Sequence, residues 1–174
     1  MFFRRRRAAV QALYESVLTQ ARSPEFYGAG RAPDTVDGRF ELLALHLALV
    51  IRRLQADGRK GAAIAQDLFD AFVRDMDANL RELGASDARF GKKMRHIVQS
   101  FYGRAKSYTD ALEAEGEGDL RDALFRNLFD GAAPPEELNR MVEYCRRSAE
   151  TLAATGPDDW FGGARIFPPP PAES

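Results

Sequence analysis

A lysine pair, two histidines and one cysteine are the residues of this chain whose types and spacing could support chemistry. Gly91-Lys92-Lys93 is similar to the end of a phosphate-binding loop, in which backbone amides and a lysine hold the phosphates of a nucleotide. That loop requires G-x-x-x-x-G-K-[S/T] after a strand, but six residues separate Gly84 from Gly91, and Lys93 stands where the hydroxyl is needed. The lysine pair therefore does not indicate a nucleotide site of this kind.

Catalysis by a nucleophile or an acid–base group would depend on Cys145, His46 or His96. Cys145 lies in a helical pattern, where a half-buried cysteine with a packing role is the favoured interpretation. His46 lies within the apolar segment 42–51, which favours a hydrogen-bonded core histidine. The alternative left open is an enzyme in which His46 acts as acid or base and Arg39 grips a small anionic substrate.

No metal or cofactor is expected. A carboxylate-bridged di-iron bundle needs Glu-x-x-His pairs, and neither histidine has a glutamate three residues before it. One cysteine cannot form a thiolate zinc site or an internal disulfide, which indicates a reducing compartment or indifference to redox conditions.

Charge is segregated along the chain although the formal net charge is only −1. Residues 67–82 hold five acids and two arginines, whereas residues 91–106 hold five cations and no acid. The two segments either pair with each other, at ~0–1 kcal/mol for each exposed pair, or the cations face outward toward an acidic partner or polyanion. Four further arginines, Arg4, Arg5, Arg6 and Arg7, precede any acid, so a weak contact with an anionic surface is open there too.

Each residue of the segment Asp37-Gly38-Arg39-Phe40 has a physical role in the prediction. Asp37 places negative charge at a helix start, and Gly38 permits the close approach of another segment. Arg39 can hold a carboxylate, and Phe40 anchors in the core. A structural clamp is the first interpretation and a binding feature the second. Gly91 and Gly103 each cost roughly 1 kcal/mol in a helix interior, which suggests that a helix or a ligand approaches there.

These residues require helices to position them, because apolar residues recur at three- and four-residue steps almost throughout. We predict an all-α, single-domain bundle of about six helices. The expected bounds are about 5–22, 34–57, 61–83, 87–115 and 120–129, with a sixth helix within residues 131–156 that has proline at its start and Gly156 after its end. The second helix is expected at the centre because it is apolar on most of its circumference. Residues 1–156 form the predicted domain, and the proline-rich residues 157–174 are expected to be an irregular, mobile tail.

The order of three motif blocks resembles the ubiquinol–cytochrome c chaperones, which are assembly factors of the cytochrome bc1 complex. The blocks are D-x-x-D-G-R-F-x-L-x-x-L-H from Asp34 to His46, R-E-L-G-x-x-D from Arg81 to Asp87, and F-Y-G-R from Phe101 to Arg104. The resemblance is clear over residues 13–112, and it is limited to helical character beyond them. It implies an all-helical protein that is not an enzyme and that binds newly made cytochrome b.

The resemblance and the charge pattern together give the predicted sites. The predicted client- or partner-binding residues are Asp34, Asp37, Arg39, Arg81, Glu82, Asp87, Lys92, Lys93, Arg95, Phe101, Tyr102, Arg104 and Tyr108. In this prediction the aromatic residues supply contact area and the cations attract acidic loops, ribosomal RNA or anionic lipid. Arg4–Arg7 are the predicted membrane or polyanion contact.

The resemblance also implies contact with the ribosome and, in mitochondrial relatives, a small partner protein. The short arginine-rich start resembles the bacterial members, so we expect a monomer in the bacterial cytoplasm, peripheral to the inner membrane, with no specific DNA target. A nucleic-acid-binding module that uses Arg4–Arg7 and the 91–106 cations is the third, weaker alternative.

Overall fold

The computed structural model describes residues 2–82, 87–114, 117–162 and 165–171, and the side chains within this part from Arg6 onward except those of residues 87, 88 and 117. Seven α-helices and one short 3₁₀ helix run through these residues, and no strand occurs among them. Their bounds are α1 Phe2–Ala21, η1 Pro24–Phe26, α2 Val36–Gln55, α3 Gly58–Glu82, α4 Asp87–Glu113, α5 Glu117–Asn127, α6 Pro135–Ala153 and α7 Pro157–Phe161. The all-α prediction is confirmed, and the bounds differ from the predicted ones by a few residues.

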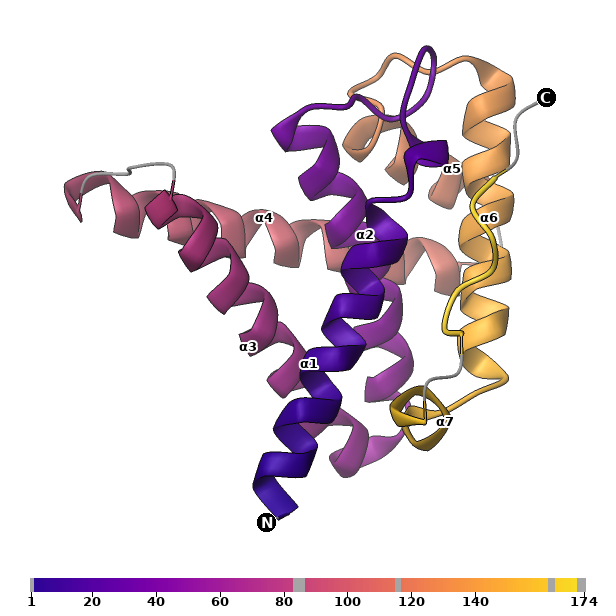
Figure 1. Cartoon of the computed structure of the whole chain (residues 1–174). Coiled ribbons are helices and arrows are strands. Elements are labelled where there is room, and N and C mark those ends of the chain that lie inside the picture. The colour runs from indigo at the N-terminus through magenta and orange to yellow at the C-terminus, as the bar shows by residue number, and fades with distance from the viewer. Residues whose placement is uncertain (1, 83–86, 115–116, 163–164, 172–174) are drawn as a thin grey trace.

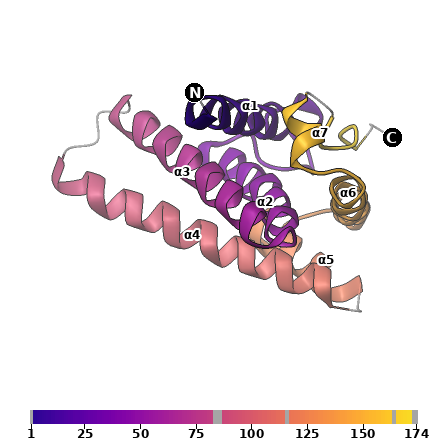
Figure 2. The same cartoon turned by 90° about the horizontal axis from the view of Figure 1, so that it is seen from below.

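The second helix, α2, is the centre of the molecule, as its apolar sequence predicts. Every residue from Glu41 to Val50 is buried. The helix packs against α1, α3, α4 and α6, and these surround it in Figure 2. Burying a large aliphatic side chain contributes about 1.5–3 kcal/mol, so this one helix supplies much of the driving force for folding.

The junction between α2 and α3 turns sharply because glycine permits it. Gly58 has φ of +66°, and only two residues separate it from the end of α2. A Cβ on Gly61 would lie 1.8 Å from the carbonyl oxygen of Leu54, so the corner closes only with glycine there. The result directs α3 back along α1 and α2, and α3 and α4 then extend together to one side of the body (Figure 1).

Arg53 fixes the end of α6 to the central helix. Its Nε donates to the carbonyl of Leu152 and an Nη donates to the carbonyl of Thr155, both at 3.0 Å. These carbonyls lie at the C-terminal end of a helix, where partners are lacking and positive charge is favourable. Arg53 is thus a structural residue in the second half of α2.

The prediction of an irregular, mobile tail from residue 157 is wrong for much of that segment. Residues 157–161 form α7, and Trp160, Ile166 and Phe167 are buried. The Nε2 of Gln20 in α1 donates to the carbonyl oxygen of Pro168 at 3.0 Å. Large apolar side chains between the prolines hold this segment against α1 and α6, although its proline content resembles that of a free tail.

Candidate functional site

A groove of about 1140 Å³ lies where α1, α2, α3 and α4 meet. The N-terminal half of α2 and the C-terminal ends of α1 and α3 contribute to its walls, together with the middle of α4 and residues 126–130. Apolar side chains form much of its surface, including Phe40, Leu43, Met76, Leu80, Ile97 and Leu128. We call this hollow the motif groove, because all three motif blocks contribute to it.

Four predicted site residues line the motif groove: Asp37 and Arg39 from the first block, Glu82 from the second and Arg104 from the third. They come from three helices and from positions up to 67 residues apart, so only the fold brings them together. Other polar and charged side chains that the sequence analysis did not select join them, including Arg22, Glu41, His96, Arg126 and Asp130. No sequence signal marks these residues, because their place depends on how α1, α4 and α5 pack.

The wall at the start of α2 is held by the clamp that the sequence suggests. Thr35 caps the helix, because its Oγ1 accepts from the backbone amide of Gly38 at 3.1 Å. Arg39 Nε donates to Asp34 Oδ1 at 2.8 Å in an exposed pair, with one contact instead of a two-pronged grip. The Phe40 ring lies 6.5 Å from that of Phe72, anchoring the turn in the core.

Glycine is required at position 38 but not at position 103. A Cβ on Gly38 would lie 2.0 Å from the carbonyl oxygen of Pro33, whereas a Cβ on Gly103 would meet nothing within 4 Å. We expect Gly38→Ala to destabilise the chain by about 3 kcal/mol through forced displacement. Gly103→Ala should stabilise it by about 0.5–1 kcal/mol through helix propensity. Urea denaturation of both variants measures this contrast, and equal effects would contradict the geometry.

Glu41 and Arg104 form the most buried ion pair in the groove wall. Arg104 Nη2 donates to Glu41 Oε1 at 2.6 Å, and Nε lies 3.0 Å from both carboxylate oxygens. Their side chains are 11% and 31% exposed, respectively, and the hydrogen bonds to Glu41 raise the pKa of Arg104. This pair ties α2 to α4, so Arg104 acts within the chain first and is not a free cation.

The predicted pairing between the acids of residues 67–82 and the cations of residues 91–106 is wrong in the described residues. The acids pair elsewhere: Asp67 with Arg6, Asp75 with the hydroxyl of Tyr14, and Asp77 with Arg81. Arg104 pairs with Glu41, and Lys106 pairs with Asp110 in the next turn. Lys92, Lys93 and Arg95 are exposed and lie near no described acid.

The prediction that Phe101 and Tyr108 are exposed contact residues is wrong. Both side chains are only 1% exposed. The ring of Phe101 packs at 5.2 Å from Phe72 in the core, and burial raises the pKa of Tyr108. Tyr102, which is 55% exposed, is the aromatic residue of this group that reaches the surface.

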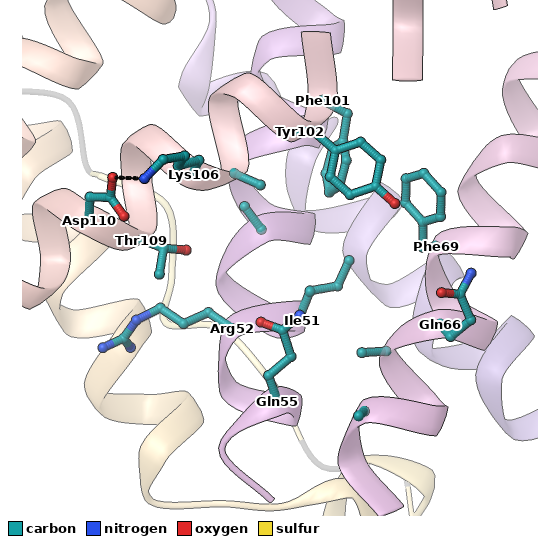
Figure 3. Close-up of a pocket in the computed structure, with 14 residues that line it drawn as sticks. Ile51, Arg52, Gln55, Gln66, Phe69, Phe101, Tyr102, Lys106, Thr109 and Asp110 are labelled. Atoms are coloured by element: carbon teal, nitrogen blue, oxygen red, sulfur yellow. Dashed lines mark hydrogen bonds and ion pairs between the residues drawn. The ribbon is translucent and has the colours of Figure 1, made fainter. Parts of the chain in front are cut away.

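Tyr102 borders a second, smaller hollow of about 330 Å³ between α2, α3 and α4 (Figure 3). Its ring lies 5.1 Å from that of Phe69 on α3, and the two stand side by side at one end of this cleft. Lys106 and Asp110 close the other side through their ion pair. The cleft is too small for a polypeptide segment, so we regard it as secondary to the motif groove.

The remaining predicted residues lie apart from the groove lining. Arg81 pairs with Asp77 and its guanidinium lies 4.5 Å above the ring of Phe90. Arg6 pairs with Asp67 at 2.7 Å, and Arg7 is exposed. The side chains of Arg4, Arg5 and Asp87 lie outside the described residues.

His46 is a core residue, and the enzyme alternative that depended on it is contradicted. Its side chain is fully buried; Nδ1 lies 2.7 Å from the carbonyl oxygen of Leu42, and Nε2 lies 2.7 Å from the hydroxyl of Tyr144. A carbonyl only accepts, so Nδ1 carries the proton and Nε2 accepts from Tyr144. Burial lowers the pKa of His46 to about 4. Both nitrogens are engaged, so the ring has no capacity left for a substrate beside the exposed Arg39.

Cys145 is also enclosed, because its side chain is fully buried and burial raises the pKa of its thiol to about 12. A thiol in that state is not a nucleophile. Within the described residues, no group of three or more His, Cys, Asp or Glu side chains is placed to hold a metal ion. The motif groove therefore has the features of a binding surface: an apolar floor and a charged rim.

An all-helical body with an apolar groove lined from three motif blocks is suited to binding another molecule. The chain belongs to the ubiquinol-cytochrome C chaperone family, whose pattern matches residues 29–166. The match extends past residue 112, where the resemblance that is clear from sequence alone ends, and it includes the buried Trp160 and Ile166.

Individual relatives agree with this family. The chain is similar to ubiquinol-cytochrome c reductase complex assembly factor 1 of Mus musculus, with 24% identity over 152 residues that cover 87% of this chain and 51% of the relative. The protein of that name from Drosophila melanogaster is 24% identical and is covered over 59% of its length. The chain thus spans about half the length of these curated relatives.

A solved structure is also similar, the Cbp3 homolog from Brucella abortus. It is 30% identical, with a TM-score of 0.83 over 95% of this chain and 92% of that chain. The all-helical architecture is therefore shared over nearly the whole length of this chain.

Proposed function

We propose that this chain is a chaperone that binds newly synthesised cytochrome b and assists assembly of the cytochrome bc1 complex, without catalysing a reaction. The observation that carries the proposal is the motif groove, into which three separated motif blocks bring Asp37, Arg39, Glu82 and Arg104. Family membership and the names of the relatives support the same process.

The shape and chemistry of the motif groove suit a segment of an apolar client. An unassembled membrane subunit exposes apolar helices that need temporary cover, and an apolar floor with a charged rim offers such cover without permanent association. Val36 stands at the groove with 78% of its surface exposed, which is unusual for a large apolar residue in this chain. We propose that the client contacts this residue and the adjacent floor.

The place of action is proposed as the bacterial cytoplasm beside the inner membrane, with the protein acting as a monomer. No helix in the described residues is both long and apolar enough to cross a bilayer. We also propose that Arg4–Arg7 contact an anionic membrane or the ribosome. One of these arginines, Arg6, is paired with Asp67. No specific DNA target is proposed.

Replacing Val36 by glutamate tests the groove. A negative charge in the first turn of a helix is favourable, so Val36→Glu should keep the fold intact while placing a charge at the apolar entrance. In a bacterium with a bc1 complex, we expect cytochrome b accumulation and bc1 activity to fall at least about tenfold, since apolar contact worth roughly 1.5 kcal/mol is lost.

Val36→Leu is the matched control, because it keeps an apolar side chain, and it should support normal cytochrome b levels. Cytochrome b that co-purifies with the tagged chain provides the direct measurement. If the glutamate variant retains cytochrome b like the parent, the motif groove does not hold the client. If deletion of the whole gene leaves cytochrome b unchanged, the proposed function itself is wrong.

A further inference from the structure

The solvent side of α4 carries exposed cations, which are concentrated in its first half at Arg89, Lys92 and Arg95. Successive helical residues turn by about 100°, so residues 89–106 place one set of side chains on one half of the helix over a length of about 26 Å. We call this set the α4 outer face; it comprises Arg89, Gly91, Lys92, Arg95, His96, Gln99, Tyr102, Gly103 and Lys106, all of them exposed. No acid occurs between Arg89 and Lys106 in the sequence.

Nothing in the described chain covers or neutralises most of this face. Among its cations only Lys106 has an ion pair with a described acid, Asp110. A Cβ on Gly91 or on Gly103 would meet nothing within 4 Å, so the expectation that another helix of the chain packs there is wrong. Glycine weakens a helix relative to alanine. No packing contact within the described chain accounts for the two glycines on this face.

The composition of the α4 outer face favours a bilayer as the occupant. A protein partner would find no apolar centre, because Tyr102 is the face's one large hydrophobic side chain. A single-stranded nucleic acid would need several aromatic rings along its path, and the face offers one. A layer of anionic headgroups needs only spread positive charge, and tyrosine is enriched at the level of the headgroups.

We propose that the α4 outer face is the surface through which this chain contacts a bilayer that contains anionic phospholipids. The inference rests on the proposed function in one respect: membrane contact through the α4 outer face would place the motif groove beside the proposed membrane client. His96 belongs to both the outer face and the groove lining, so the groove opens along one flank of the proposed contact.

The α4 outer face and the N-terminal arginines are separate candidates for membrane contact. In Figure 2, α1 and α4 lie on opposite sides of the molecule, with α2 and α3 between them. The N-terminus is also remote from the start of α4 in both Figure 1 and Figure 2. Variants of each segment therefore test the two proposed membrane contacts independently.

The test is co-sedimentation of the full chain with vesicles of phosphatidylcholine, with or without phosphatidylglycerol, at low and high salt. Lys92→Gln/Arg95→Gln should bind the anionic vesicles about 30-fold more weakly than the parent. Arg59→Gln/Lys60→Gln is the matched control, because it removes the same charge from two exposed residues at the start of α3. This control should stay within about threefold of the parent. The Arg4–Arg7→Ser variant should lose less binding than the α4 double variant, although it removes more charge.

Three results would overturn the inference. Equal loss in the α4 and α3 double variants would show that net charge alone governs binding. Full loss in the Arg4–Arg7 variant with an intact α4 variant would assign the contact to α1. Failure of the parent to bind anionic vesicles, together with salt-sensitive retention by RNA, would assign the face to nucleic acid. Cytochrome b that co-purifies from detergent extracts is measured separately, so each outcome is independent of the proposed function.

Discussion

Replacing Arg104 by alanine is expected to lower the free energy of unfolding by about 2–3 kcal/mol, because the substitution leaves the carboxylate of Glu41 buried without its partner. Glu41 is 11% exposed and accepts three hydrogen-bond contacts from Arg104. The part of Arg104 that is exposed, 31%, places the effect at the lower end of the range for buried pairs.

Lys106→Ala is the matched control for this prediction. Lys106 lies on the same helix and pairs with Asp110, but both partners are largely exposed, so its loss should leave the stability nearly unchanged. The double variant Glu41→Leu/Arg104→Met should recover much of the loss, since apolar residues of similar volume replace buried pairs at little cost. Equal denaturation midpoints for Arg104→Ala and Lys106→Ala would show that the groove pair does not bind α2 to α4.

The stability of the chain is expected to fall as the pH decreases from 6.5 to 4 because of His46. Burial lowers its pKa from 6.5 to about 4 in the folded chain, so the folded state favours the neutral ring. This contribution to stability is fully present above the pKa of the unfolded chain and is lost as the pH falls toward the pKa of the folded chain. The difference between the two pKa values corresponds to about 3 kcal/mol of unfolding free energy. Tyr144 and Leu42 face the ring nitrogens and Phe26 and Phe167 flank the ring, so no nearby charge compensates protonation.

His46→Gln separates this contribution from that of the carboxylates, which also titrate in this range. The variant should be less stable at pH 7 but lose less stability than the parent between pH 6.5 and 4. His96→Gln is the control, because it removes an exposed histidine and leaves the buried ring of His46 in place. If His46→Gln keeps the parent's pH dependence, the buried ring is not its source. Normal cytochrome b levels in this variant would agree with a purely structural role.

Periodicity predicts the fold well because burial follows it directly. The nearly all-round apolar sequence of α2 indicates a central helix, and residues 41–50 are buried without exception. The apolar stripe of α4 already includes Phe101 and Tyr108, seven residues apart on the same side. Assigning them to a client surface contradicted that stripe, and their burial shows that the periodicity was the better guide.

The motif groove could be predicted only in part. The clamp at Thr35, Gly38 and Arg39 is local, so turn chemistry and glycine geometry indicate it. The partner of Arg104 lies 63 residues away in Glu41, and no local pattern reveals such a pair. Arg126 and Asp130 enter the groove because of the way α5 docks, which a single sequence does not specify.

The C-terminal segment shows the reverse error, in which composition outweighed individual side chains. Proline content predicted a free tail, but Trp160, Ile166 and Phe167 are spaced to reach the core. Three apolar residues change the composition of this segment very little, so composition does not reveal them. Their long-range contacts and the hydrogen bond from Gln20 show that the domain continues to Pro168.

The contact between Phe167 and His46 has a consequence for the order of events during synthesis. The ring of Phe167 lies 4.9 Å from that of His46, and Gln20 links the Tyr144 hydroxyl to the backbone of Pro168. The centre of the molecule is therefore completed by residues that are translated after all seven helices of the described chain. Until those residues leave the ribosome, the apolar surface around the imidazole stays open to other polypeptides.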